Sequence, residues 1–317
     1  MNSSLIDGLV GRAREGDPRA VARLITLVES NDARLAELAA ALAPHTGTAR
    51  VIGLTGSPGV GKSTVTSELV RTLRATGVRV GVLAVDPSSP FTGGALLGDR
   101  VRMQEHATDP GVYIRSMSSR GHLGGLAAAT PQAVRVLDGA GCDVILVETV
   151  GVGQAEVEVA DLADTTLVLL APGMGDAIQA VKAGILEIAD IFVVNKADRD
   201  GADATYHDIQ GMIGLAERAP GQWRPRVVRA VATRSEGIDE LVEAIAKHRE
   251  WLAGHDELQR RREQRAAAEV EAIVLARLRA RVGGPARDAA AAVAAGALDP
   301  YAAAGSILAD LGHPDVV

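Results

Sequence analysis

Aromatic side chains and cysteine are nearly absent from this chain of 317 residues. Phe, Trp and Tyr together make up 2% of the sequence, and Cys142 is its single cysteine. One cysteine allows neither an internal disulfide nor a cysteine metal cluster. The scarcity of aromatic rings leaves no stacking platform for single-stranded nucleic acid. It also means that the core must be aliphatic and rich in alanine.

The chain also lacks an excess of positive charge and any long apolar run. Its 33 Lys and Arg residues against 40 Asp and Glu residues give a net charge of −7, which disfavours DNA or RNA as a partner. No stretch reaches the roughly 18 apolar residues of a membrane span, and the first residues lack a signal-peptide pattern. The seven histidines are scattered without metal-site spacing. We therefore expect a cytoplasmic protein without a membrane or nucleic-acid partner.

A phosphate-binding pattern is present at residues 56–63, which read Gly-Ser-Pro-Gly-Val-Gly-Lys-Ser. It matches G-x-x-x-x-G-K-[ST] and lies between an expected strand at 51–55 and an expected helix at 64–73. In such a loop the backbone N–H groups wrap the phosphates, the lysine reaches the β and γ oxygens, and the serine hydroxyl suits Mg²⁺. The residues expected to contact a nucleoside triphosphate are Gly56, Ser57, Pro58, Gly59, Val60, Gly61, Lys62, Ser63 and Thr64.

A guanine-reading pattern follows the expected strand at 191–195, where the sequence runs Asn195, Lys196, Ala197, Asp198. The Asp198 carboxylate can accept hydrogen bonds from N1–H and N2–H₂ of guanine, and adenine offers neither. Asn195 can hold the loop and the base edge, while the stem of Lys196 packs over the ring. Ala232 and Thr233 follow another expected strand and can present a backbone N–H to guanine O6. The predicted cofactors are therefore GTP and GDP.

Three carboxylates are candidates for approaching Mg²⁺: Asp86, Asp99 and Glu148. Glu148 ends an otherwise apolar strand and is followed by Gly151, as in an acid-x-x-Gly switch, whereas a solvated loop carboxylate explains Asp99 equally well. The residues expected to be catalytic are Lys62, Asp99 and Glu148. No residue identifies itself as the group that orients the attacking water, although Glu148 and, more weakly, Gln154 are candidates.

Strands and helices alternate between about residues 50 and 250, which predicts an α/β fold with a mostly parallel sheet covered on both faces. The expected strands are Val51–Thr55, Val78–Val85, Val112–Arg115, Val144–Glu148, Thr166–Ala171, Ile191–Asn195 and Arg226–Ala230. We divide the chain into N-terminal helices at 1–47, a nucleotide-binding domain at 48–250 and a helical region at 251–317. In the last, a helix from Glu257 to Arg281 should end at 283–285, Gly-Gly-Pro. Its apolar stripe could fold back on the core or pair with a second subunit.

The motifs together resemble the MeaB/ArgK family of methylmalonyl-CoA mutase-associated GTPases, relatives of the metal-insertion and signal-recognition G proteins of the SIMIBI type. The segments that carry the resemblance are Thr55–Thr64, Val85–Pro90, Phe91–Gly94, Leu97–Arg100, Glu148–Gln154, Gly173–Asp176 and Leu298–Tyr301. The resemblance implies that Asp86, Asp99 and Glu148 approach the metal in different nucleotide states. It also implies a switch that reports the nucleotide to a partner, formed by Gly151, Gln154, Gly175, Asp176, Gln179 and Lys182. From the residues alone, the two glycines of the segment 171–182 suggest a hinge, but an ordinary strand–helix connection is the favoured interpretation.

The same resemblance implies a homodimer formed through the C-terminal arm and a role as chaperone of an adenosylcobalamin-dependent mutase. The client would be methylmalonyl-CoA mutase, with gated cofactor loading, protection or reactivation, and a cobalamin adenosyltransferase as a further partner. Three alternatives stay open at this point. These are a client of the isobutyryl-CoA type, a kinase that transfers phosphate to an acceptor, and an adaptor that binds GTP without useful hydrolysis.

Overall fold

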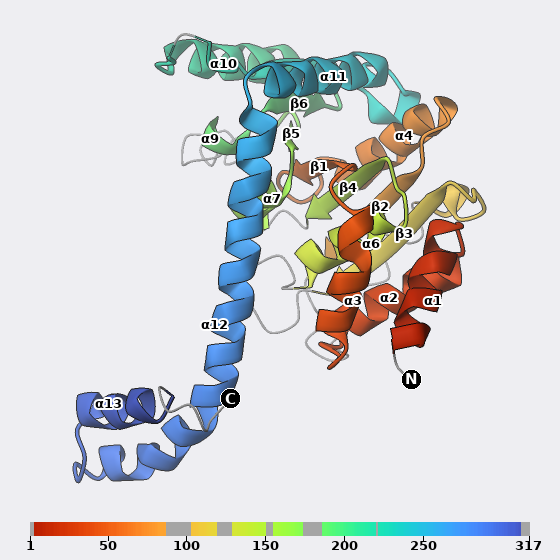
Figure 1. The fold of residues 1–317 in the computed structure, drawn as a ribbon. Helices are drawn as coiled ribbons and strands as arrows, with labels where there is room; N and C mark the ends of the chain where they lie inside the picture. Colours follow the sequence, from red (N-terminus) through yellow and green to blue (C-terminus); the bar gives the residue numbers. More distant parts are fainter. Residues whose placement is uncertain are drawn as a thin grey trace. The chain divides into compact units, whose positions relative to one another are not determined.

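The computed structural model describes residues 3–86, 103–118, 129–149, 155–173, 186–219 and 221–311. The chain forms two compact units, residues 1–261 and 262–317. In the first unit, strands and helices alternate along the described chain from residue 50 to residue 254 (Figure 1). None of the helices in these described ranges is long and apolar enough to cross a membrane.

The described part of the first unit contains one sheet of seven strands in the order β3-β2-β4-β1-β5-β6-β7. The strands are β1 Arg50–Thr55, β2 Val80–Asp86, β3 Val112–Ser118, β4 Val144–Thr149, β5 Thr165–Leu170, β6 Ile191–Asn195 and β7 Arg226–Ala230. All pairings between neighbouring strands are parallel. The predicted α/β fold with a parallel sheet is therefore confirmed.

Helices pack on both faces of this sheet (Figure 1). One face carries α1 Ser3–Arg14, α2 Pro18–Glu29, α3 Leu35–Leu42, α6 Thr130–Gly139, α7 Ala155–Leu162 and α10 Ala202–Leu215. The other face carries α4 Lys62–Ala75 and α11 Ile238–Gly254. The short helices are η1 Ala43–His45, η2 Gln104–His106, α9 Leu186–Ile188 and η4 Ala232–Arg234.

Burial on both faces explains why the strands could be recognised as unbroken apolar runs. Every residue of β4, β5 and β6 is buried. This is the pattern of a parallel sheet between two helical layers. Phe192 is the one aromatic ring among the largest fully buried side chains of the described core, and leucine, isoleucine and methionine form the rest. The predicted aliphatic core is therefore present.

The second N-terminal helix, α2, begins at a side-chain cap. The Asp17 side chain accepts hydrogen bonds from the backbone N–H groups of Arg19 at 2.8 Å and Ala20 at 3.4 Å. Pro18 occupies the first helical position of α2, where a missing N–H costs nothing. The helix then buries an apolar face that includes Leu24 and Ile25. A polar cap followed by proline is a typical start of a helix.

The helix α12 runs from Glu257 to Ala294 with Pro285 inside it, so the prediction that residues 283–285 end this helix was wrong. A proline in a helix removes one N–H donor and clashes with the carbonyl four residues earlier. The residues that follow Pro285 are rich in alanine, which has the highest helix propensity and lets the helix continue. A second helix, α13, covers Pro300–Leu311.

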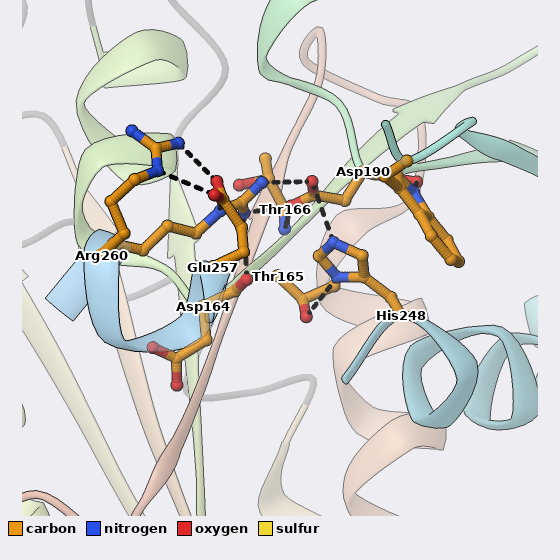
Figure 2. Close-up of polar contacts among 9 residues, drawn as sticks. Asp164, Thr165, Thr166, Asp190, His248, Glu257 and Arg260 are labelled. Atoms are coloured by element: carbon orange, nitrogen blue, oxygen red, sulfur yellow. Dashed lines mark hydrogen bonds and ion pairs between the residues drawn. The ribbon is translucent and has the colours of Figure 1, made fainter. Parts of the chain in front are cut away.

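The first turn of α12 is bound to the sheet through a buried carboxylate, Asp190, which directly precedes β6 (Figure 2). Nη1 and Nη2 of Arg261 each donate to this carboxylate at 2.9 Å, and the backbone N–H of Thr166 donates at 2.8 Å. Nε2 of His248 lies 3.2 Å from Asp190 Oδ1. Nδ1 of the same ring lies 2.9 Å from the hydroxyl of Thr165. The network joins β5, β6, α11 and α12.

Burial alone would raise the pKa of Asp190. The contacts with His248 and Arg261 outweigh this effect and hold the pKa of the carboxyl below its ordinary value of 3.8. A carboxyl whose pKa falls on folding stabilises the folded state above its ordinary pKa. That contribution is lost as the pH falls through the lower, folded-state pKa.

We therefore expect Asp190→Asn to lower the free energy of unfolding at neutral pH by about 3 kcal/mol, because it leaves Arg261 without its buried counter-charge. The difference from the wild-type protein should shrink in strong acid, where wild-type Asp190 also becomes protonated. Denaturant titrations of the full chain at several pH values measure both effects. Asp203→Asn is the matched control, because Asp203 also pairs with an arginine but its side chain is 79% exposed. Equal losses in the two variants would contradict the prediction.

Candidate functional site

The expected site residues follow strands that are neighbours in the sheet. The phosphate loop follows β1, Glu148 lies in β4 beside β1, and Asn195 ends β6 two places away. Because all of these strands are parallel, their carboxyl ends meet at one edge, where open α/β sheets bind ligands. The topology thereby brings together residues that are far apart in the sequence.

The phosphate loop has a backbone shape that requires glycine at two of its positions. Gly56 has φ +140°, and a Cβ there would lie 2.3 Å from the carbonyl oxygen of Leu169. Gly61 has φ +94°, and a Cβ there would lie 2.4 Å from Nδ2 of Asn195. α4 begins at the next residue, Lys62, so the loop leads directly into the positive end of a helix.

The side chain of Lys62 is buried and lies over the loop. Its Nζ donates to the carbonyl oxygens of Gly56 at 2.7 Å and Ser57 at 3.1 Å. These bonds place a positive charge among the backbone groups of the phosphate loop. The position suits an ammonium group that is expected to meet phosphate oxygens.

A buried carboxylate lies at the start of α4. Oε1 of Glu148 accepts a 2.6 Å hydrogen bond from the Ser63 hydroxyl, and Glu148 is 4% exposed. Its other oxygen, Oε2, accepts a 3.0 Å hydrogen bond from the hydroxyl of Thr66. The sequence prediction included Ser63 and Glu148 and missed Thr66. The available signal was its place one helical turn after Ser63, which puts both hydroxyls on one side of the helix.

The carboxamide of Asn195 connects three loops. Its Nδ2 donates to the carbonyl oxygen of Val60 at 2.8 Å, and its Oδ1 accepts from the backbone N–H of Ala232 at 3.2 Å. The next residue, Lys196, has φ +56° and donates from Nζ to the carbonyl oxygen of Gly59 at 2.7 Å. The guanine-reading motif is therefore fastened to the phosphate loop by two side chains.

Asp198 lies at the surface of the same loop. Its carboxylate pairs with the guanidinium group of Arg234 at 3.3 Å, and the Asp198 side chain is 35% exposed. Arg234 belongs to η4, as do Ala232 and Thr233, so the two segments expected to contact guanine face each other. Thr233 is exposed and Ala232 is buried.

Several expected residues lie outside the part of the chain that is described. These are Asp99, Gly151, Gln154, Gly175, Asp176, Gln179 and Lys182. Asp86 is described only as the last residue of β2. Among the described residues, no group of three His, Cys, Asp or Glu side chains forms a metal cluster. The donors that do meet, the Ser63 hydroxyl and the Glu148 carboxylate, are the oxygen ligands that Mg²⁺ prefers.

A separate hollow of about 720 Å³ lies between α10, β7 and α11. It contains none of the expected site residues. Its charged lining is mixed, with Arg224 and Arg226 as well as Glu240 and Glu243. The phosphate loop and the Asn195 motif therefore stay the candidate site.

The parallel sheet, the phosphate loop between β1 and α4, and the Asn195 motif after β6 define a P-loop GTPase domain, a fold that implies binding of GTP and GDP. Residues 21–286 match the family described as methylmalonyl-CoA mutase-associated GTPase MeaB, and the chain belongs to this family. The expected resemblance is therefore confirmed.

Individual proteins are similar to this chain over most of its length. The chain is 50% identical to a putative GTPase of Pyrococcus abyssi, over 97% of both chains. It is 38% identical to the mouse protein named methylmalonic aciduria type A homolog, mitochondrial, over 81% of this chain and 66% of that one. A solved structure described as LAO/AO transport system kinase is similar at a TM-score of 0.72, with 29% identity and coverage of 99% of both chains.

The contact between Gly61 and Asn195 leads to a test of the site. Gly61→Ala should weaken binding of a non-hydrolysable GTP analogue about 100-fold, because the new methyl group displaces the Asn195 amide and strains the backbone. Gly59→Ala is the control, since Gly59 shares a positive φ of +81° but a Cβ there would meet nothing within 4 Å. It should lose about tenfold or less. Isothermal titration calorimetry measures the affinity of both variants for the analogue. Similar losses of affinity in the two variants would contradict the role of Asn195.

Proposed function

We propose that this chain is a Mg²⁺-dependent GTPase switch that serves as chaperone to an adenosylcobalamin-dependent acyl-CoA mutase. The observation that carries the GTPase chemistry is the joining of the phosphate loop to the guanine motif through Asn195. The client is inferred from the family description, which names methylmalonyl-CoA mutase. Nucleotide state would gate loading of the mutase with its cofactor and its protection or reactivation. A mutase of the isobutyryl-CoA type is the alternative client, and a cobalamin adenosyltransferase is a further candidate partner.

In this proposal the phosphate loop, residues 56–64, holds the triphosphate with its backbone N–H groups. Lys62 contacts the β and γ oxygens, while Ser63 and Glu148, with Asp86 and Asp99, hold the Mg²⁺ ion. The ion would neutralise charge on the phosphate oxygens. Catalysis of water attack then comes mostly from positioning and from neutralised charge.

Base selection would rest on the loops after β6 and β7. The Asp198 carboxylate accepts from N1–H and N2–H₂ of guanine, and its pairing with Arg234 orients it. Lys196 covers the ring with its stem, and the segment of Ala232 and Thr233 offers a backbone N–H to O6. The switch function is assigned to Gly151, Gln154, Gly175, Asp176, Gln179 and Lys182.

The proposal is tested by measuring hydrolysis of GTP by the purified chain, alone and with methylmalonyl-CoA mutase from the same source. We expect a rise in turnover of about tenfold or more with the mutase, well below the roughly 10⁵-fold given by an arginine finger in trans. ATP should not be hydrolysed, and Lys62→Ala should abolish the response. If the chain hydrolyses GTP but the mutase neither changes the turnover nor binds to the chain, the GTPase activity stands and this client is excluded. An isobutyryl-CoA-type mutase then takes its place in the same assay.

A kinase is the second candidate, because the similar solved structure is described as a transport system kinase. A kinase needs an acceptor pocket and a base aimed at a hydroxyl. The guanine motif disfavours it, since most phosphate-loop kinases use ATP. Labelled γ-phosphate distinguishes the two activities, because a GTPase releases inorganic phosphate and a kinase transfers the label to an acceptor.

We also infer that the chain forms a homodimer through its third region, residues 251–317. The other two regions are the N-terminal helices at 1–47 and the nucleotide-binding domain at 48–250. α12 buries none of its described side chains, and an apolar stripe along it is exposed. The exposed fractions are Val270 62%, Ile273 37%, Val274 49%, Leu275 43% and Leu278 41%. A contiguous apolar surface of this kind on a helix is typical of an association site.

The paired change Val274→Glu and Leu278→Glu should therefore convert the protein to a monomer at micromolar concentration, because it places charges in the apolar stripe. Light scattering coupled to size-exclusion chromatography measures the mass. Ala272→Glu is the control, because at 100° per residue Ala272 lies about 160° from Val274 and about 120° from Leu278 around the helix. A wild-type monomer, or a dimer that survives both glutamates, would contradict the inference.

A further inference from the structure

Thr66 of α4 carries a fully buried hydroxyl group at the candidate site. Its Oγ1 lies 3.0 Å from the carbonyl oxygen of Lys62 and 3.0 Å from Oε2 of Glu148. A threonine hydroxyl has one proton, so it can donate to one of these acceptors at a time. The bond to the carboxylate is the stronger one, since its acceptor is ionised.

Ser63 donates to the other oxygen of the same carboxylate, Oε1, at 2.6 Å. Ser63 and Thr66 are three residues apart on one helix and so lie on the same side of it. Donors on both oxygens restrict the rotation of the carboxylate about its last side-chain bond more than a donor on one oxygen does. Because Glu148 is 4% exposed, bulk water cannot readily replace a missing donor.

We propose that Thr66 is a positioning residue that fixes the plane of the Glu148 carboxylate beside the phosphate loop. With Glu148 fixed, Ser63 directs its proton to the carboxylate and keeps its oxygen lone pairs for the metal ion. The inference rests on the proposed function, in which Ser63 and Glu148 hold Mg²⁺ beside the β and γ phosphates. Thr66 contacts neither nucleotide nor ion and acts through Glu148.

A purely structural role makes a different prediction. If Thr66 only satisfies the carbonyl oxygen of Lys62, its loss should affect stability and leave the metal response alone. Thr205 provides the comparison, because it is 4% exposed and its hydroxyl donates to the carbonyl oxygen of Gly201 at 3.0 Å, also four residues earlier. Thr205→Val therefore reports the loss of the same local bond away from Glu148.

The experiment uses the full chain with a fluorescent GDP analogue and measures the Mg²⁺ concentration that half-maximally slows its release. Thr66→Val should raise this concentration about tenfold, the effect of one lost hydrogen bond to a charged group. It should lower kcat for GTP by a similar factor, while GDP affinity in excess chelator stays unchanged. Thr66→Ser, which keeps the hydroxyl, should restore both values, and Thr205→Val should match the wild-type protein.

A folded Thr66→Val protein with wild-type Mg²⁺ dependence and kcat would overturn the role of Thr66 and leave the proposed GTPase intact. A wild-type protein whose GDP release ignores Mg²⁺ would overturn the proposed metal site and the role of Thr66 with it. Thermal denaturation shows whether each variant is folded. If Thr66→Val is not, Thr66→Ala takes its place with the same expected shift.

Discussion

The candidate site depends on one buried side chain, the carboxamide of Asn195. It donates to the phosphate loop at Val60 and accepts from the loop after β7 at Ala232, so both ends of the amide are used. Leaving one end of this buried amide unpaired would cost about 1–3 kcal/mol. Separating any of the three loops would break one of the two bonds, so the loops keep their positions relative to one another. The ligand that the motifs predict has a phosphate end and a base end. Asn195 fixes the distance between the parts of the protein that would bind them.

This connection requires the complete sheet. Asn195 and Val60 are 135 residues apart in the sequence, and Ser63 and Glu148 are 85 residues apart. Both contacts form because β4, β1, β5 and β6 are consecutive in the sheet and all point the same way. Contacts over such separations have a high loop-closure entropy, because the intervening chain must be ordered when they form. Damage to the core between these strands therefore reaches the site even where no site residue is changed.

The sequence was sufficient for features that depend on local pattern. The strands appear as apolar runs because they are buried on both faces, and the Asp17-Pro18 cap is a local signal at the start of α2. Features that depend on competition between neighbouring segments were harder. Gly283, Gly284 and Pro285 are strong helix breakers, yet the alanine-rich residues beyond them continue α12 through Pro285.

Most contacts between side chains of distant segments could not be predicted from the sequence. The hydrogen bond from Thr66 to Glu148 and the pairing of Arg261 with Asp190 follow from the packing of whole elements. Neither pair belongs to a motif, and the one signal for Thr66 is its place one helical turn after Ser63. Motifs therefore identified the residues that would touch a nucleotide and missed those that hold these residues in place.

Three side chains of the candidate site also orient the backbone amides of the phosphate loop. Lys62, Lys196 and Asn195 donate to the carbonyl oxygens of Gly56, Gly59 and Val60, respectively. In a trans peptide the carbonyl and the following N–H point in opposite directions. Each of these bonds therefore turns the N–H of the next residue, at positions 57, 60 and 61, away from the side chain that makes it. The two lysine side chains and the asparagine side chain therefore shape the loop before a ligand binds. Their bonds help to give the loop the anion-binding shape that glycine permits.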